Sequence, residues 1–279
     1  MFYLRLSVLS LSFIATTLLL MSCNGGGQSA YGHALDRVNA TGKIKLAAIN
    51  YPPSMIVSPN GSSRSGIMHE VMESMAENLN VEIEYVEETT WATMIEAVRS
   101  KRVDAVVSGI WPSSERARKA DFTSAVYYSP VFAYVRANDG RFDGHLDQII
   151  EQRARLAAID GELSSIIART DYPSLEVVSL PNSTDVSQLL LQLTTNKADV
   201  TFVEGAIASE FLKKNPGSIR RIAEVPPVRS FPNTFLVAKG DNLRTTLNIA
   251  IAELHGMGTI QRILDKYDPG HEKFVRVAP

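Results

Sequence analysis

The sequence has little cysteine, histidine or excess charge, and it has no second long apolar run. With one cysteine among 279 residues, it cannot form an internal disulfide. The 28 Lys and Arg residues nearly balance 30 Asp and Glu residues and form no basic stripe, so a nucleic-acid partner is not indicated. The five histidines lack metal-ligand spacing, and no nucleophile-elbow, phosphate-loop or zinc motif occurs. We therefore expect no metal and no cofactor.

The one long apolar run lies at the N-terminus. Residues 6–21 carry no charge, and this length suits the apolar region of a signal peptide better than a bilayer span. The run ends in Leu20-Met21-Ser22-Cys23, which resembles the bacterial lipobox. That resemblance implies cleavage after residues 1–22 and a diacylglyceryl group on Cys23. The alternative is an ordinary secretory signal beside a stray cysteine.

A flexible tether is predicted to follow Cys23. The segment Asn24-Gly25-Gly26-Gly27-Gln28-Ser29 is rich in glycine, so we assign residues 23–40 to the lipidated cysteine and its tether. Several acyl chains anchor a protein durably, because each buried methylene contributes ~0.8 kcal/mol. The expected location is the cell envelope, with the protein facing the periplasm or the cell exterior and touching the membrane through this lipid alone.

Apolar periodicity in the first half alternates between strand and helix. The segments 43–49, 81–86 and 103–107 are predicted strands, and 67–79 and a turn around 94–98 are predicted helices. Strands that alternate with helices indicate βαβ units and a largely parallel sheet.

The second half repeats this plan. Strands are predicted at 155–159, 175–178 and 199–203, and helices at 163–169 and 186–195. A further strand at 234–238 and helices at 243–255 and 259–267 remain, and they are expected to return to the first half. The sequence therefore predicts an α/β protein with two similar lobes.

Ligands of open parallel sheets lie beyond the carboxyl ends of the strands. In the two predicted sheets this rule points to Tyr51, to residues 109–111, to Gly161 and Glu162, and to Glu204. If two such edges face each other, they form one cleft.

A longer motif carries a family resemblance. Ser108-Gly109-Ile110-Trp111-Pro112-Ser113-Ser114-Glu115-Arg116, followed by Asp121-Phe122-Thr123, resembles a Gly-x-Thr-x-Thr-x-Glu-Arg motif with a later Asp-Phe-Ser. Tyr51-Pro52-Pro53, Thr90-Trp91 and the segments 198–204 and 258–267 fall in matching order. From about residue 42 to 267 the chain resembles the family 3 extracellular solute-binding proteins, the polar amino-acid receptors of ABC importers.

The resemblance implies a fold and a function. It implies a two-lobed venus-flytrap fold with hinge strands near 127–136 and 229–235, each lobe having a mainly parallel sheet flanked by helices. We expect lobe 1 to comprise residues 41–132 and 233–279, and lobe 2 residues 133–232. The expected function is non-enzymatic: a monomer captures a small polar solute, an amino acid or a related compound, and delivers it to an ABC-transporter permease.

The resemblance also assigns roles to residues. Arg116 would hold a ligand carboxylate through two parallel N–H bonds, and Arg116→Ala would then abolish binding of such a ligand. Without the motif, Arg116 would be another surface arginine beside Arg118 and Lys119. Glu204 would receive the ligand's ammonium group, or else it is a carboxylate that favours a helix start. Tyr51 and Trp91 would flank the ligand, although Trp91 is also explained by core packing.

Two predicted ligand-binding residues depart from the family pattern. Trp111 replaces a threonine, so a hydroxyl is lost beside the expected contacts of Ser108 and Gly109. Glu162 follows Gly161 where the family has Thr or Ser at a helix N-terminus that binds an anion. A glutamate there would occupy the anion site itself, recruit a cationic ligand, or remain a surface residue.

Three further expectations concern two aspartates and two alternative functions. Asp104 and Asp199 are expected to serve local hydrogen bonds rather than the ligand. A related enzyme class, the periplasmic cyclohexadienyl dehydratases, carries an acid three residues after the Glu204 position, where this chain has Ile207, which cannot transfer protons. A sensory ligand-binding protein that contacts a receptor would present the same site.

Overall fold

The computed structural model describes residues 33–277, and its elements follow the predicted alternation of strands and helices. The first elements are α1 (Ala34–Thr41), β1 (Lys43–Ala48), β2 (Ile56–Val57), β3 (Arg64–Ser65), α2 (Ile67–Leu79), β4 (Glu82–Glu88), α3 (Met94–Arg99), β5 (Ala105–Ile110), α4 (Ser114–Ala117), β6 (Ala120–Phe122) and β7 (Tyr127–Arg136). The remainder are α5 (Gln148–Glu151), β8 (Leu156–Ile159), α6 (Leu163–Asp171), β9 (Val177–Leu180), α7 (Val186–Thr194), β10 (Val200–Glu204), α8 (Gly205–Lys214), β11 (Ile219–Arg221), β12 (Arg229–Ala238), α9 (Leu243–Gly256) and α10 (Thr259–Tyr267).

The main sheet has the strand order β4-β1-β5-β12-β7-β10-β8-β9, with β6 paired to β12 and β11 paired to β7. Strand β1 lies parallel to β4 and β5, and β8 lies parallel to β9 and β10. The parallel strands β1, β4 and β5 belong to the first lobe and β8, β9 and β10 to the second. Strands β6 and β11 join them through antiparallel pairing with β12 and β7. The predicted fold class, two α/β lobes with mainly parallel sheets, is confirmed.

Helices cover both faces of the sheet in each lobe. In the first lobe one face buries residues of α2, α9 and α10, and the opposite face buries residues of α3. In the second lobe α6 covers one face and α7 and α8 cover the other. Helix α2 illustrates the local cause, because its apolar residues recur at helical spacing and all but the partly buried Leu79 are buried. It ends at Asn80, whose left-handed conformation lets its N–H reach the carbonyls of Ala76 and Glu77.

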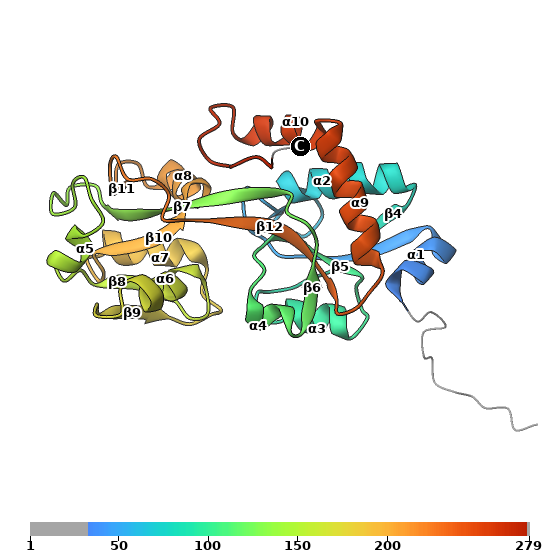
Figure 1. The fold of residues 1–279 in the computed structure, drawn as a ribbon, viewed down its shortest axis with the longest axis horizontal. Helices are drawn as coiled ribbons and strands as arrows, with labels where there is room; N and C mark the ends of the chain where they lie inside the picture. Colours follow the sequence, from blue (N-terminus) through green and yellow to red (C-terminus); the bar gives the residue numbers. More distant parts are fainter. Residues whose placement is uncertain (1–32, 278–279) are drawn as a thin grey trace, which may run out of the picture. The chain divides into compact units, whose positions relative to one another are not determined.

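Strands β7 and β12 connect the lobes and lie side by side between them (Figure 1). They pair antiparallel from Arg229 opposite Val131 to Asn233 opposite Tyr127. Asn233 donates a side-chain hydrogen bond to Ser129 Oγ at 2.9 Å. Both predicted hinge strands are therefore present, and β12 continues three residues past the predicted end at 235.

Gly109 at the end of β5 permits close packing beside these strands. A Cβ at this position would collide with the side chains of Asn233 and Ser54. Ser54 in turn accepts a hydrogen bond from the Tyr127 hydroxyl at 3.0 Å. A larger residue than glycine would therefore push apart the loop after β1 and the two connecting strands.

Several predicted boundaries differ from the observed ones by two residues or more, as in β5, which occupies 105–110 rather than 103–107. Residues 34–40 were assigned to the tether, but they lie in α1, whose Val38 is buried in the core of the first lobe. Helix α1 is fixed by a hydrogen bond from Ala34 N to Asp241 Oδ2 at 2.8 Å and by an ion pair between Arg37 and Asp104. Strand β9 occupies 177–180 rather than 175–178. The signal peptide, Cys23 and residues 24–29 lie outside the described residues, and the lobe boundaries stay predictions.

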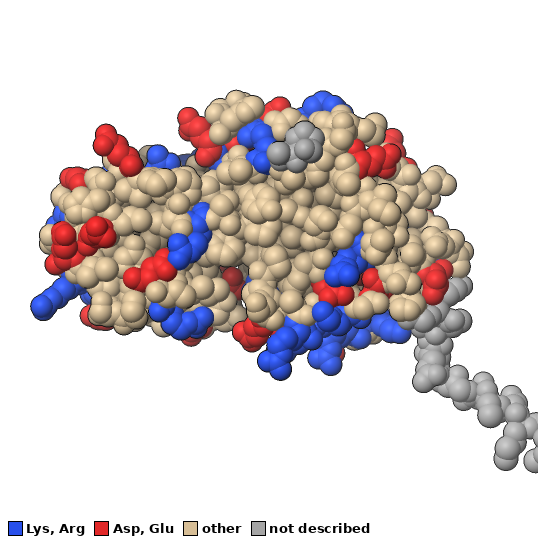
Figure 2. Space-filling model, viewed as in Figure 1, with Lys and Arg blue, Asp and Glu red and all other residues tan. Residues whose placement is uncertain are grey.

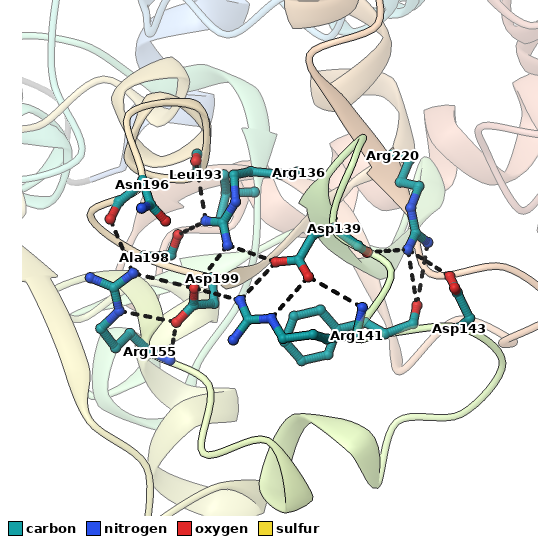
Figure 3. Close-up of polar contacts among 11 residues, drawn as sticks. Arg136, Asp139, Arg141, Asp143, Arg155, Leu193, Asn196, Ala198, Asp199 and Arg220 are labelled. Carbon is teal, nitrogen blue, oxygen red and sulfur yellow. Dashed lines mark hydrogen bonds and ion pairs between the residues drawn. The ribbon is translucent and has the colours of Figure 1, made fainter.

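A cluster of arginines surrounds Asp199, just before β10 (Figure 3). Its carboxylate accepts hydrogen bonds from Arg136 at 2.9 Å, Arg141 at 2.8 Å and Arg155 Nε at 3.0 Å. Asp139 also accepts from Arg136, at 2.6 Å. Both aspartates do more than the expected local hydrogen bonding, because Asp104 accepts from Lys45 N in β1 at 2.6 Å and pairs with Arg37 of α1, while Asp199 joins three arginines.

Burial by itself raises the pKa of the Asp199 carboxyl, but the hydrogen bonds from Arg155, Arg136 and Arg141 outweigh it and hold that pKa well below its ordinary value. A carboxyl whose pKa is lower in the folded state than in the unfolded state, where it is about 3.9, stabilises the fold at pH values above that unfolded pKa. That stabilisation is lost as the pH falls from about 3.9 through the lower pKa of the folded state. The ion pairs around Asp199 therefore stabilise the second lobe at neutral pH.

We expect Asp199→Ala to lower the free energy of unfolding by about 1.5–3 kcal/mol at pH 7, because Arg155 loses its carboxylate partner and Arg136 and Arg141 are left to share Asp139. Urea unfolding at several pH values measures this effect. The difference from the wild type should shrink as the pH falls below about 4.

Asp143→Asn is the matched control. Asp143 pairs with Arg220 at 2.6 Å in the same region but its side chain is 65% exposed. It should cost at most about 1 kcal/mol. Equal losses for the two variants would show that the Asp199 cluster has no special stabilising role.

Candidate functional site

A cavity of about 340 Å³ lies at the strand ends of both lobes. Seven of the nine predicted ligand-binding residues line it: Tyr51, Trp91, Gly109, Trp111, Arg116, Glu162 and Glu204. The other two, Ser108 and Gly161, are not among the lining residues. The structure thus brings together most of the residues that the sequence analysis selected.

Ser108 and Gly161 lie next to residues that line the cavity. Ser108 is fully buried within β5, and within the described part of the chain its Oγ has no hydrogen-bond partner. Gly161 has φ +73° in the turn between β8 and α6. Since a side chain rarely adopts that conformation, glycine is favoured there, and the turn positions Glu162 at the start of α6.

Tyr51 and Trp91 form an aromatic wall from the first lobe. Tyr51 is fixed by a tight turn in which its N–H donates to the Met55 carbonyl at 2.7 Å and its carbonyl accepts from the Met55 N–H at 3.0 Å. Its ring meets Trp91 edge to face, with centroids 5.3 Å apart. The Tyr51 hydroxyl donates to Glu204 Oε2 at 2.6 Å, which joins the wall to the second lobe.

Arg116 lies in the short helix α4 and points toward the second lobe. Ser113 begins the helix by accepting a hydrogen bond from Arg116 N at 3.2 Å. The guanidinium donates from Nη1 to the Trp111 carbonyl at 3.2 Å and from Nη2 to Glu162 Oε1 at 2.9 Å. Arg118 and Lys119 are exposed, as expected. Of these three basic residues, only Arg116 lines the cavity.

Glu162 precedes the first turn of α6 but does not cap it with its side chain. Its backbone carbonyl accepts from the N–H groups of Ser165 and Ile166, both at 3.1 Å. The carboxylate instead extends to Arg116, and the two side chains are 21% and 17% exposed. Burial raises the pKa of the Glu162 carboxyl, while the Arg116 guanidinium opposes that rise.

Glu204 ends β10 and is only 3% exposed. Burial raises the pKa of its carboxyl to about 7, the Tyr51 hydrogen bond opposes the rise, and the nearby charge of Glu162 adds to it. Within residues 33–277 no Lys, Arg or His forms an ion pair with Glu204. A buried carboxylate without a cationic partner is costly, and a positively charged group beside Glu204 would offset that cost.

Trp111 lines the cavity from the loop after β5. Its indole stacks on Phe231 of β12, with centroids 5.1 Å apart and planes 25° apart. The indole Nε1 is buried and has no hydrogen-bond partner among the described residues. The side chain that replaces the family's threonine is thus held against a connecting strand.

A polar rim was missed by the sequence analysis. The loop between β9 and α7 contributes Asn182, Ser183, Thr184 and Asp185. The last residue of β4, Glu88, also lines the cavity, as do Thr89 and Thr90 in the segment after it. The rule on strand ends applies to β9 as well, but the predicted strand ended two residues early and its loop was not considered.

The cavity is mainly acidic. Its lining includes four carboxylates, from Glu88, Glu162, Asp185 and Glu204, and one guanidinium, from Arg116. By contrast, acidic and basic side chains are interspersed over the face shown in Figure 2. Within residues 33–277, no group of three His, Cys, Asp or Glu residues is placed to hold a metal ion. No helix in the same range is long and apolar enough to cross a membrane.

Ile207 belongs to the hydrophobic core of the second lobe and not to the cavity lining. It is the residue at the position where the dehydratases carry an acid. The cavity therefore has no proton-transferring group at that position.

Curated relatives match most of the chain at low identity. A probable histidine-binding protein of Campylobacter jejuni is 23% identical over 254 residues, which cover 91% of this chain and 94% of the relative. The arginine-binding extracellular protein ArtP of Bacillus subtilis is 22% identical and covers 83% of this chain and 89% of its own.

Solved structures show the same fold. An ancestral amino acid-binding protein, described as a precursor of cyclohexadienyl dehydratase, superposes with a TM-score of 0.71 at 20% identity, over 84% of this chain and 99% of the other. A solute receptor for L-cysteine of Neisseria gonorrhoeae gives a TM-score of 0.70 at 18% identity, over 88% of this chain and 100% of the other.

The family that matches the chain covers residues 44–270, which include both lobes and every residue that lines the cavity. The chain belongs to the bacterial extracellular solute-binding proteins, family 3.

Proposed function

We propose that this protein captures a small polar solute, an amino acid or a related compound, in the cavity between its lobes and delivers it to an ABC-transporter permease. The observation that carries this proposal is the meeting of Tyr51, Trp91, Arg116, Glu162 and Glu204 around one cavity from elements of both lobes. Opening and closing about β7 and β12 would admit and enclose the solute. The nine residues selected from the sequence are proposed to bind the solute or to position those that do.

Binding without catalysis is favoured over an enzymatic role. The curated relatives described above are named as binding proteins, and the histidine- and arginine-binding names fit a cavity that is rich in carboxylates. The apolar Ile207 in the core argues against the dehydratase alternative. A sensory protein would use the same cavity and would differ only in its partner.

The membrane anchor is part of the proposal. Cys23 would carry the lipid, and the segment between it and α1 would let the lobes reach a permease in the same membrane. The protein would work as a monomer, with its lipid as its only membrane contact.

We expect a thermal-shift screen of the full chain against amino acids, polyamines and small dicarboxylates to identify one class of compounds that raises the unfolding midpoint. A ligand at one hundred times its dissociation constant adds about 2.7 kcal/mol, which moves the midpoint by several degrees. Glu204→Gln should weaken the ligand found by at least about tenfold, because the carbonyl that replaces the carboxylate has no charge.

Glu151→Gln, which removes a charge from the exposed end of α5, should leave the affinity unchanged. If no compound shifted the midpoint, or if Glu204→Gln bound as well as the wild type, the assignment of the cavity as the binding site would be wrong.

Binding of a cationic ligand should weaken as the pH falls. The Glu204 carboxyl has a pKa of about 7, raised by burial, so acid protonates it and removes the charge that attracts the ligand. The affinity should fall by about tenfold from about pH 8 to about pH 6. Titration calorimetry in buffers across this range measures the slope, and Glu204→Gln should flatten it. A slope that persists in the variant would assign the titration to another group.

Cys23→Ser should move the protein from the membrane fraction to the soluble fraction, because the hydroxyl cannot accept the lipid as the thiol does. Cell fractionation and labelling with a fatty-acid analogue measure this directly. Ser22→Ala keeps a small residue before the cysteine and should remain membrane-bound. A Cys23→Ser protein that stays in the membrane fraction would contradict the lipid anchor.

A further inference from the structure

The ion pair between Arg116 and Glu162 engages the guanidinium that the family resemblance assigns to a ligand carboxylate. Nη2 donates to Glu162 at 2.9 Å and Nη1 donates to the Trp111 carbonyl at 3.2 Å. A ligand carboxylate that approached both nitrogens would have to compete with these bonds. The Glu162 carboxylate therefore already provides the negative charge that Arg116 requires.

Glu162 is placed for this role by its own loop. The left-handed turn at Gly161 begins α6, and the Glu162 carbonyl, rather than its carboxylate, accepts the bonds of the first helical turn. The side chain is thereby directed to Arg116 in the other lobe. The two partners come from residues 46 positions apart, on separate lobes, so the pair spans the cavity.

After Arg116 and Glu162 neutralise each other, the cavity keeps an excess of negative charge. Glu204 remains in its interior without a cationic partner among the described residues, and the exposed Glu88 and Asp185 lie at its rim. A ligand carboxylate would share Arg116 with Glu162 and would add a third acidic group close to Glu204. A ligand cation instead gains an ion pair with Glu204 and the faces of Tyr51 and Trp91.

The remaining lining suits a carbon chain. Ile159, Leu163, Leu189 and Val203 contribute apolar side chains beside these charged groups. A cavity of about 340 Å³ holds a short aliphatic amine with room to spare.

We propose that the cavity selects a cationic amine or guanidine that lacks a carboxylate, because Glu162 occupies Arg116 and rejects a second carboxylate. This inference rests on the proposed function and specifies its ligand class. Glu162 is the specificity-determining residue: its charge acts against amino acids, and Glu204 attracts the cation.

Titration calorimetry of the full chain with matched pairs of compounds tests the proposal. The pairs are arginine and agmatine, lysine and cadaverine, and ornithine and putrescine, whose members differ by one carboxylate. In the pair that binds most tightly, the decarboxylated member should bind at least about tenfold more tightly than the amino acid.

Glu162→Gln keeps the size of the side chain and removes its charge. It should raise the affinity for the amino acid of that pair by at least about tenfold and reduce the preference to less than about threefold. Glu162→Thr, with the residue type of the family, should act in the same direction if the glutamine variant does not fold. Glu151→Gln should keep the wild-type preference.

Each remaining outcome overturns a defined claim. An amino acid that binds the wild type as well as its decarboxylated partner refutes the ligand class and leaves the proposed function standing. An unchanged preference in both Glu162 variants refutes the role of Glu162. Absence of binding by either member of all three pairs, with amino acids also inactive in the thermal screen, refutes the proposed function and this inference with it.

Discussion

The antiparallel pairing of β7 with β12 is the constraint on which the rest of the structure depends. These strands carry one sheet through both lobes, so the carboxyl ends of the parallel strands in each lobe reach the same cavity. Their contact region is tightly packed, with Asn233 bonded to Ser129 and no room for a side chain at Gly109. Two connecting strands would favour opening and closing of the lobes, the motion proposed for ligand capture.

The charged side chains of the cavity differ in whether they have a partner of opposite charge. Arg116 and Glu162 pair across the lobes, whereas Glu204 is bonded by the Tyr51 hydroxyl and has no cationic partner within residues 33–277. The difference appears in the Glu204 carboxyl, whose pKa burial raises to about 7. A cationic ligand would supply the positive charge that Glu204 lacks. Because the buried carboxylate has already lost its water, the ion pair with such a ligand would be stronger than one at the surface. Tyr51 alone cannot do this, because a hydroxyl offers a hydrogen bond but no charge.

The sequence predicted most of the elements because their apolar residues repeat at the period of a helix or strand. Helix α2 and the hinge strands were placed within a few residues. Helix α1 was missed, because its eight residues carry one fully buried side chain and its position depends on Asp241 and Asp104, which are distant in sequence. The polar loop from Asn182 to Asp185 was missed because a two-residue error in β9 hid the strand end that precedes it.

For the site, motif order placed residues at the cavity and left occupation of the anion site by Glu162 as one of three alternatives for that residue. That Glu162 bonds Arg116 depends on how the two lobes approach each other, and no local pattern encodes it. The same holds for Asp199, whose three arginine partners come from the end of β7, the loop that follows it and the start of β8. In both cases the residue type indicated a charged side chain, and the fold determines which residue pairs with it. Specificity in such a cavity is a difference between two affinities, and it arises as much from the carboxylate that repels as from the one that attracts. On the proposal made here, a single glutamate at the start of α6 would change the ligand class while the fold, the hinge and the aromatic wall stay the same.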